Sequence, residues 1–298
     1  MTVQIFSRLM TGLALLAPGV PFAAETLPGL QLSAGVDYSS GDYGQTTSTE
    51  VFVVPVSARL TWGAWSLRAS VPYVTVSGPA DISVIVDDGG GDGGSPNSGS
   101  GSRSSGSGSS GSGGSGSGSG DGTPTPTVFS SSRSVSGIGD SSLALTYSFD
   151  AIAESPVYVD LTGRIKFATG RESVGLGSGT TDYFSTSELG WDAGTGGVYV
   201  NGGRRFLGSS TVPRVDGWQW GAGAWWAATP AVELGVNYSG RDASVAGGKK
   251  AGAAEASVKL KVARDWQMVA YGGAGLSKAS ADYTGGLTLI WHATGRRN

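Results

Sequence analysis

Residues Val157–Thr169 read VYVDLTGRIKFAT, and apolar side chains occupy every second position through most of this stretch. A β-strand turns successive side chains to opposite faces, so one face of this segment is apolar and the other is polar. The apolar face carries Val157, Val159, Leu161, Ile165 and Phe167, and the opposite face carries Tyr158, Asp160, Thr162, Arg164 and Lys166. The pattern recurs about a dozen times from about Leu30 to Trp291, which predicts a barrel with lipid outside and water inside.

The composition favours a membrane barrel over a soluble globular domain. Charged residues make up 14% of the 298 residues, whereas about 25% is usual in soluble proteins. Glycine, with 52 residues, is far above its usual share. The formal net charge of -3 offers no excess of basic residues, so we expect no nucleic-acid partner. The chain has no cysteine, so disulfides do not stabilise it.

The first 24 residues have the pattern of a secretory signal peptide. The apolar run Leu9–Ala17 follows Arg8, a break at Pro18–Gly19 comes next, and Phe22–Ala24 precedes the expected cleavage point. A short buried helix is the alternative interpretation. An exported chain without a further apolar run of about 18 residues can span a membrane only as a closed barrel, and we expect residues 25–298 to form one.

The alternating segments predict twelve strands, an even number, as in single-chain bacterial outer-membrane barrels whose two ends lie in the periplasm. In chain order they are Leu30–Tyr38, Glu50–Leu60, Trp65–Val74, Ser141–Phe149, Val157–Thr169, Tyr183–Trp191, Val198–Leu207, Gly217–Trp226, Val232–Arg241, Ala254–Ala263, Trp266–Leu276 and Tyr283–His292. The expected fold class is therefore all-β, a transmembrane antiparallel up-and-down β-barrel of about twelve strands.

The connections between these strands alternate in length. The short ones are Thr61–Ala64, Asp150–Pro156, Asp192–Gly197, Ala227–Ala231 and Arg264–Asp265. Longer ones are Ser39–Thr49, Gly170–Asp182, Gly208–Asp216 and Asp242–Ala253, the stretch from Val74 to Ser141 is by far the longest, and Ser277–Asp282 is short. Outer-membrane barrels have short periplasmic turns and longer outer loops, so the alternation predicts that the chain enters the barrel from the periplasm.

Aromatic residues lie where the two membrane interfaces should be. At the short-turn ends of strands stand Trp65, Trp191, Trp226, Trp266 and Trp291; at the opposite ends stand Tyr38, Tyr73, Tyr183, Tyr238 and Tyr283. Tryptophan and tyrosine favour this depth because the ring is apolar while the N–H or O–H needs water. Two such bands predict an aromatic girdle at each interface.

The inward parity of the strands collects most of the charges. These expected lumen residues are Asp37, Arg59, Arg68, Asp160, Arg164, Lys166, Glu188, Glu233, Glu255, Lys259 and Lys261. A lipid-facing Arg or Lys at the midplane would cost about 2–4 kcal/mol, which fixes the register strongly. Arg204 and Arg205 are adjacent, so one of them must extend toward the interface or lie above the lipid.

A Gly/Ser-rich segment interrupts the strand pattern. Residues 87–126 consist almost entirely of Gly, Ser and Asp before a final Thr-Pro repeat, so we expect a disordered outer loop. An inert hydrophilic tether is the first interpretation of its role. A calcium site at Asp87, Asp88 and Asp92 is the second, because the spacing resembles Gly/Asp calcium repeats, and a surface-contact role is the third.

The residues that commonly carry catalysis are scarce. His292 is the single histidine and lies near the chain end, which leaves little support for a nucleophile–histidine pair or a metal site. Gly175–Thr180 looks like a phosphate loop but precedes a strand instead of a helix. Asp160 and Glu188 could form a glycosidase pair, although a lumen network with Arg164 and Lys166 fits them better. We expect no enzyme, no cofactor and no metal.

Three motifs resemble a known family. Gly137–Phe149, Lys166–Gly170 and Gly175–Tyr183 are similar to segments of the outer-membrane barrel family labelled "MetA-pathway of phenol degradation". Ala168 replaces the proline that is usual in that family, and the Gly/Ser insert is longer. Members of this family are described as transporters or porins. The resemblance implies an outer-membrane channel for small solutes, including small aromatic or other hydrophobic compounds.

Two functions therefore compete. The first is a monomeric channel in the bacterial outer membrane, whose lumen charges select small solutes. The second is a closed structural barrel that presents residues 87–126 for surface interaction. The expected partners in the first case are outer-membrane lipid and a small solute. A barrel enzyme is the weakest alternative because the sequence lacks a suitable general base.

Overall fold

The computed structural model describes residues 29–43, 48–78, 133–149, 156–208 and 213–293. The signal peptide predicted at residues 1–24 and the Gly/Ser segment predicted at residues 87–126 lie outside these residues. Among the described residues, no helix is long and apolar enough to cross a membrane.

The described chain consists of strands and one short 3-10 helix. They are β1 (Gly29–Gly41), β2 (Thr49–Trp62), β3 (Trp65–Gly78), β4 (Arg133–Ile138), β5 (Ser141–Phe149), β6 (Val157–Phe167), η2 (Glu172–Val174), β7 (Asp182–Asp192), β8 (Gly196–Phe206), β9 (Gly217–Thr229), β10 (Val232–Arg241), β11 (Ala251–Ala263), β12 (Trp266–Gly275) and β13 (Tyr283–Ala293).

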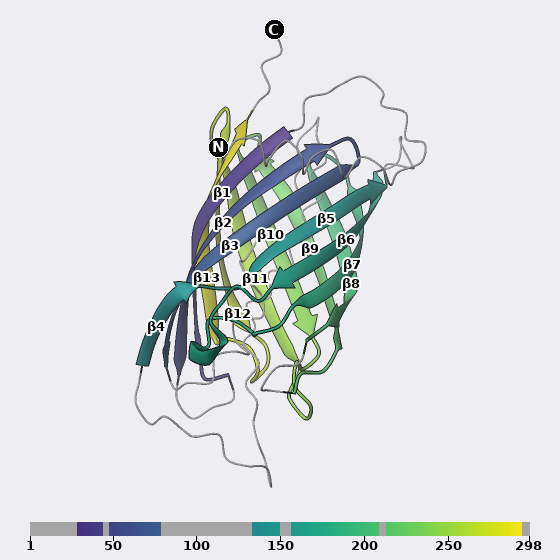
Figure 1. The fold of residues 1–298 in the computed structure, drawn as a ribbon. Helices are drawn as coiled ribbons and strands as arrows, with labels where there is room; N and C mark the ends of the chain where they lie inside the picture. Colours follow the sequence, from purple (N-terminus) through teal and green to yellow (C-terminus); the bar gives the residue numbers. More distant parts are fainter. Residues whose placement is uncertain (1–28, 44–47, 79–132, 150–155, 209–212, 294–298) are drawn as a thin grey trace, which may run out of the picture.

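The strands close into one antiparallel barrel (Figure 1). Apart from β4 and β5, which do not pair with each other, each strand pairs with its neighbours in the chain, and β1 closes the barrel against β13. β4 and β5 both pair with β3, the first along Tyr73–Gly78 and the second along Trp65–Ser70, so the two share one position. The barrel therefore has twelve strand positions, which confirms the predicted fold class.

The break between β4 and β5 falls at Gly139 and Asp140. The Gly139 amide still donates to the Pro72 carbonyl at 2.9 Å, so the ladder to β3 continues across the break. Gly139 fits because a β-carbon there would lie 2.9 Å from the Val74 side chain. β4 was not among the predicted strands.

The two ends of the barrel differ. We call the turn end the one that carries connections 63–64, 193–195, 230–231 and 264–265, and the loop end the one that carries 168–181, 207–216, 242–250 and 276–282. The turn between β2 and β3 is tight because Gly63 adopts a φ of 54°. In Figure 1 the loop end, with β4 and η2, is at the bottom.

The outer wall is apolar, and the inner wall carries most of the charged side chains of the strands. Large exposed apolar side chains on the outer face include Leu32, Val36, Val56, Leu145, Leu161, Leu189, Val236, Leu287 and Leu289. Buried charged residues include Asp37, Arg59, Asp160, Lys166, Asp182, Glu188, Arg205, Glu233 and Arg241. A continuous exposed apolar belt of this kind is unfavourable in water and suits contact with lipid.

Candidate functional site

The predicted lumen residues share the strand parity of the buried side chains. Those on this inward face are Arg59, Arg68, Asp160, Arg164, Lys166, Glu188, Glu233, Glu255 and Lys259. Lys261 follows the same parity but is exposed at the turn end of β11. These residues alternate along their strands with outward apolar residues, so their charged groups share the barrel interior. Their role in transport stays a prediction.

The predicted girdle residues lie on the outer face. Exposed there are Trp65, Trp191, Trp226, Trp266, Tyr38, Tyr73, Tyr183, Tyr238 and Tyr283, and Trp291 is partly buried. Trp65 also makes an edge contact with Tyr147, with 4.7 Å between ring centroids. The tryptophans lie toward the turn end and the tyrosines toward the loop end, as a girdle at each interface would require.

Tyrosine hydroxyls bind the acidic and amide groups of the interior. Tyr158 donates to Glu188 at 3.0 Å, and Glu188 stands directly opposite Asp160 on the neighbouring strand. Tyr271 donates to Asp37 at 2.8 Å. These phenols compensate in part for the removal of the carboxylates from bulk water.

Two of the predicted lumen cations have partners across neighbouring strands. Lys259 on β11 binds Glu233 on β10 at 2.9 Å, and both side chains are largely buried. The Arg164 guanidinium lies 3.9 Å from the centroid of the Phe184 ring on β7. Such contacts hold the side chains against the wall of the barrel.

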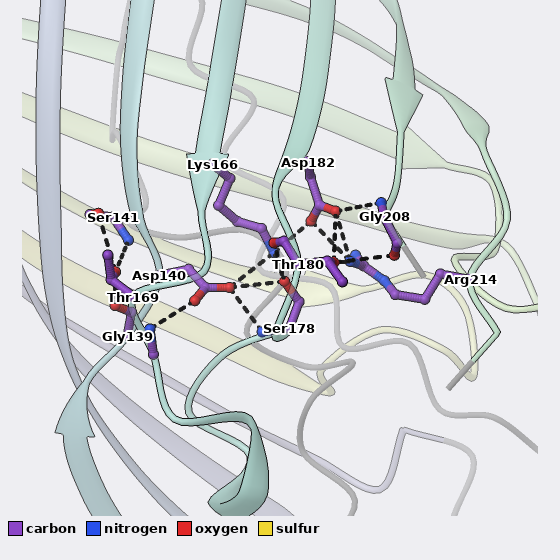
Figure 2. Close-up of polar contacts among 11 residues, drawn as sticks. Gly139, Asp140, Ser141, Lys166, Thr169, Ser178, Thr180, Asp182, Gly208 and Arg214 are labelled. Atoms are coloured by element: carbon purple, nitrogen blue, oxygen red, sulfur yellow. Dashed lines mark hydrogen bonds and ion pairs between the residues drawn. The ribbon is translucent and has the colours of Figure 1, made fainter. Parts of the chain in front are cut away.

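A buried ion cluster lies at the loop end (Figure 2). It comprises Asp140 at the β4–β5 break, Lys166 on β6, Asp182 at the start of β7, and Arg214 in the connection 207–216, and we call it the loop-end cluster. The Lys166 ammonium lies 2.7 Å from Asp182 and 3.2 Å from Asp140, and Arg214 lies 2.9 Å from Asp182. Lys166, which the sequence assigned to a network with Asp160 and Glu188, instead binds this cluster.

Hydrogen bonds from the connection 168–181 complete the cluster. The backbone amides of Gly170 and Ser178 donate to Asp140 at 3.0 and 2.9 Å, and Lys166 donates to the Ser178 hydroxyl at 2.9 Å. Lys166 and Asp140 are each only 1% exposed. Because every charge here faces an opposite charge or a polar donor, the cluster holds the connection 168–181 against the β4–β5 break and β6.

The same connection covers apolar side chains inside the barrel. Leu176 is fully buried against Val51, Val74 and Val76, which lie on the inward face of β2 and β3. Val174 of η2 and Val135 of β4 pack at the edge of this group. The connection 168–181 therefore folds inward over the β2–β3–β4 side of the loop end.

The structure resolves which of the two adjacent arginines faces outward. Arg205 is inward and buried, and it donates to the Asp242 carbonyl at 2.6 Å. Arg204 has the outward parity, and its guanidinium lies 5.1 Å from the centroid of the Trp218 ring. Asp242 lies in an outer connection, where a hydrogen bond from Lys250 and another from the Trp218 amide lower the pKa of its carboxyl group.

Comparison with known proteins identifies the fold. No family model matches the sequence, and no curated protein matches it. An outer-membrane channel from Pseudomonas putida F1 superposes with a TM-score of 0.63 at 11% identity, over 93% of this chain and 99% of that one. The chain has the fold of an outer-membrane β-barrel. At 11% identity the similarity shows the fold alone, so the resemblance to the phenol-degradation family stays a prediction.

Two further structures resemble the chain more loosely. The translocator domain of the autotransporter NalP from Neisseria meningitidis gives a TM-score of 0.47 at 12% identity, over 97% of this chain and 95% of that one. The P. putida toluene transporter TodX gives 0.44 at 10% identity, over 92% of each chain.

Proposed function

We propose that this chain is an outer-membrane channel that passes small solutes through the barrel interior. The observation that carries this proposal is the contrast between the two walls. The outer wall exposes Leu, Val, Trp and Tyr, whereas the inner wall holds carboxylates, ammonium groups and guanidinium groups from most of the strands. Lipid suits the first wall and a hydrated interior suits the second.

The barrel size agrees with selective passage. Eight strands leave an interior that side chains can fill, and sixteen enclose a broad aqueous channel, so twelve positions lie between these limits. Glu188, Glu233 and Asp160 are almost fully buried, which means that neighbouring groups crowd them. We therefore propose a narrow channel for small solutes, including the small aromatic compounds that the family resemblance implies.

A closed structural barrel is the second candidate. The inward fold of the connection 168–181, with Leu176 buried inside the barrel, favours it because this segment covers part of the loop end. Under this proposal the barrel serves as a support for the residues 87–126 that follow β3.

Single-channel recording in a planar bilayer separates the two candidates. The purified mature chain, shown to be folded by its heat-dependent gel mobility, should give discrete conductance steps if it is a channel. A folded barrel that gives no conductance at any voltage, with and without residues 87–126, would contradict the channel proposal and favour the structural one.

A further inference from the structure

Four nitrogen-bearing side chains form a row across the inner wall. His292 on β13 is the direct partner of Gln31 on β1, Gln31 is the partner of Arg59 on β2, and Arg59 is the partner of Arg68 on β3. All four have the inward parity of their strands. We call this row the donor row; it lies toward the turn end, on four adjacent strands.

The two arginines of the donor row stand directly opposite each other. Like charges at such paired positions repel and destabilise a sheet unless another group lies between them. Arg59 is only 7% exposed, so water screens the repulsion weakly. A buried guanidinium that has no counter-charge is strongly destabilising.

The guanidinium of Arg59 has no counter-charge among the described residues. No hydrogen bond or ion pair joins its guanidinium to another described side chain, and its Nε is buried without an acceptor. At the other end of the donor row, the Nε2 of His292 is also buried without a hydrogen-bond partner. In contrast, Lys166 and Lys259 each lie within 3 Å of a carboxylate.

We propose that the donor row is a binding site in the lumen for an oxyanion, namely the carboxylate of a permeating small solute. A guanidinium presents a planar fork of N–H donors that matches the two oxygens of a carboxylate. An anion between Arg59 and Arg68 would offset their mutual repulsion and supply the acceptor that the Nε of Arg59 lacks. Gln31 and His292 would extend the site along the wall.

This inference rests on the proposed channel function for its biological meaning, but binding can be measured without conduction. The thermal unfolding midpoint of the detergent-solubilised barrel is recorded in sodium benzoate, sodium acetate, sodium phosphate and sodium chloride at equal ionic strength. Binding to the folded state raises this midpoint, and we expect benzoate and acetate to raise it by at least about 2 °C over chloride.

Substitutions test whether the carboxylate-dependent shift of the unfolding midpoint arises at the donor row. Arg59→Gln should abolish the shift caused by carboxylates, whereas Lys278→Gln, which removes one positive charge from an exposed position in the connection 276–282, should keep it. Arg59→Lys retains the charge without the fork and should give an intermediate shift, and it serves if Arg59→Gln does not fold. In bilayers, benzoate should block the chloride current, with a half-blocking concentration at least about tenfold higher in Arg59→Gln.

The outcomes distinguish the two proposals. A carboxylate shift that depends on Arg59 supports the donor row even if the barrel never conducts, in which case the channel function fails alone. A shift with phosphate and none with either carboxylate would show a resident inorganic anion and overturn the assignment to a solute. A conducting barrel with no anion-specific shift, or a shift that survives Arg59→Gln, would overturn the site itself.

Discussion

The ring of Tyr158 lies over Gly190, its direct partner on the neighbouring strand, and fills the space that a β-carbon at Gly190 would need. Two further pairs, Tyr199 with Gly223 and Tyr271 with Gly286, repeat the arrangement. In each pair the glycine lets the phenol lie flat against the wall, so that its hydroxyl reaches Glu188, Asn237 or Asp37. These pairs keep bulky rings close to the wall.

Replacement of Gly190 by alanine should therefore destabilise the barrel. The new methyl group would collide with the Tyr158 ring and displace its hydroxyl from Glu188, at a cost of about 1–3 kcal/mol. Gly163→Ala is the matched control, because no atom lies within 4 Å of the β-carbon position there. Urea unfolding in micelles measures both, and equal stability of the two variants would contradict the packing argument.

Loss of a charge from the loop-end cluster should cost more than loss of a surface charge. Lys166→Met leaves Asp140 and Asp182 buried without their ammonium partner, and we expect a loss of about 3–5 kcal/mol. Lys250→Met removes a cation that also binds a carboxylate but is 73% exposed, so its effect should stay within about 1 kcal/mol. A Lys166→Met barrel as stable as Lys250→Met in the same unfolding assay would refute the structural role of the cluster.

Truncation of Leu176 should release the connection 168–181 from the barrel interior. Leu176→Ala removes a fully buried side chain, a change that typically lowers the stability by about 2–5 kcal/mol. We expect this loss to favour local opening of the connection 168–181. Limited trypsin digestion reports the release, because Arg171 lies in the connection and should be cut faster. Cleavage after Lys249, in the connection 242–250, is the internal standard. Unchanged cleavage after Arg171 would show that the cluster alone holds the segment.

The strands could be predicted because apolar and polar side chains alternate with a period of two along most of the chain. Val232–Arg241 and Ser141–Phe149 were predicted with the bounds that the structure shows. β4 was missed, because Gly139 and Asp140 interrupt it after six residues and a long Gly/Ser-rich segment precedes it. Sequence alternation identifies long strands and loses short ones beside a break.

The sequence predicted on which face of its strand each lumen residue lies, but not which residues it contacts. Parity predicted that Lys166 points inward, but its partners Asp140 and Asp182 are held there by a connection that folds back into the barrel, which no local pattern encodes. The same limit applies to Leu176, because nothing in the stretch Gly175–Thr180 indicates that this side chain folds back into the barrel. The donor row escaped notice as a row because it depends on the register of four strands.

Cysteine accessibility tests the central claim, a water-filled interior, most directly, because the native chain has no cysteine. Ser257 faces inward at the middle of β11 and Val258, the next residue, faces outward. A membrane-impermeant cationic thiol reagent should reduce the single-channel conductance of Ser257→Cys and leave that of Val258→Cys unchanged. Conductance that persists in Ser257→Cys with no response to the reagent, or a response confined to Val258→Cys, would contradict passage through the barrel interior.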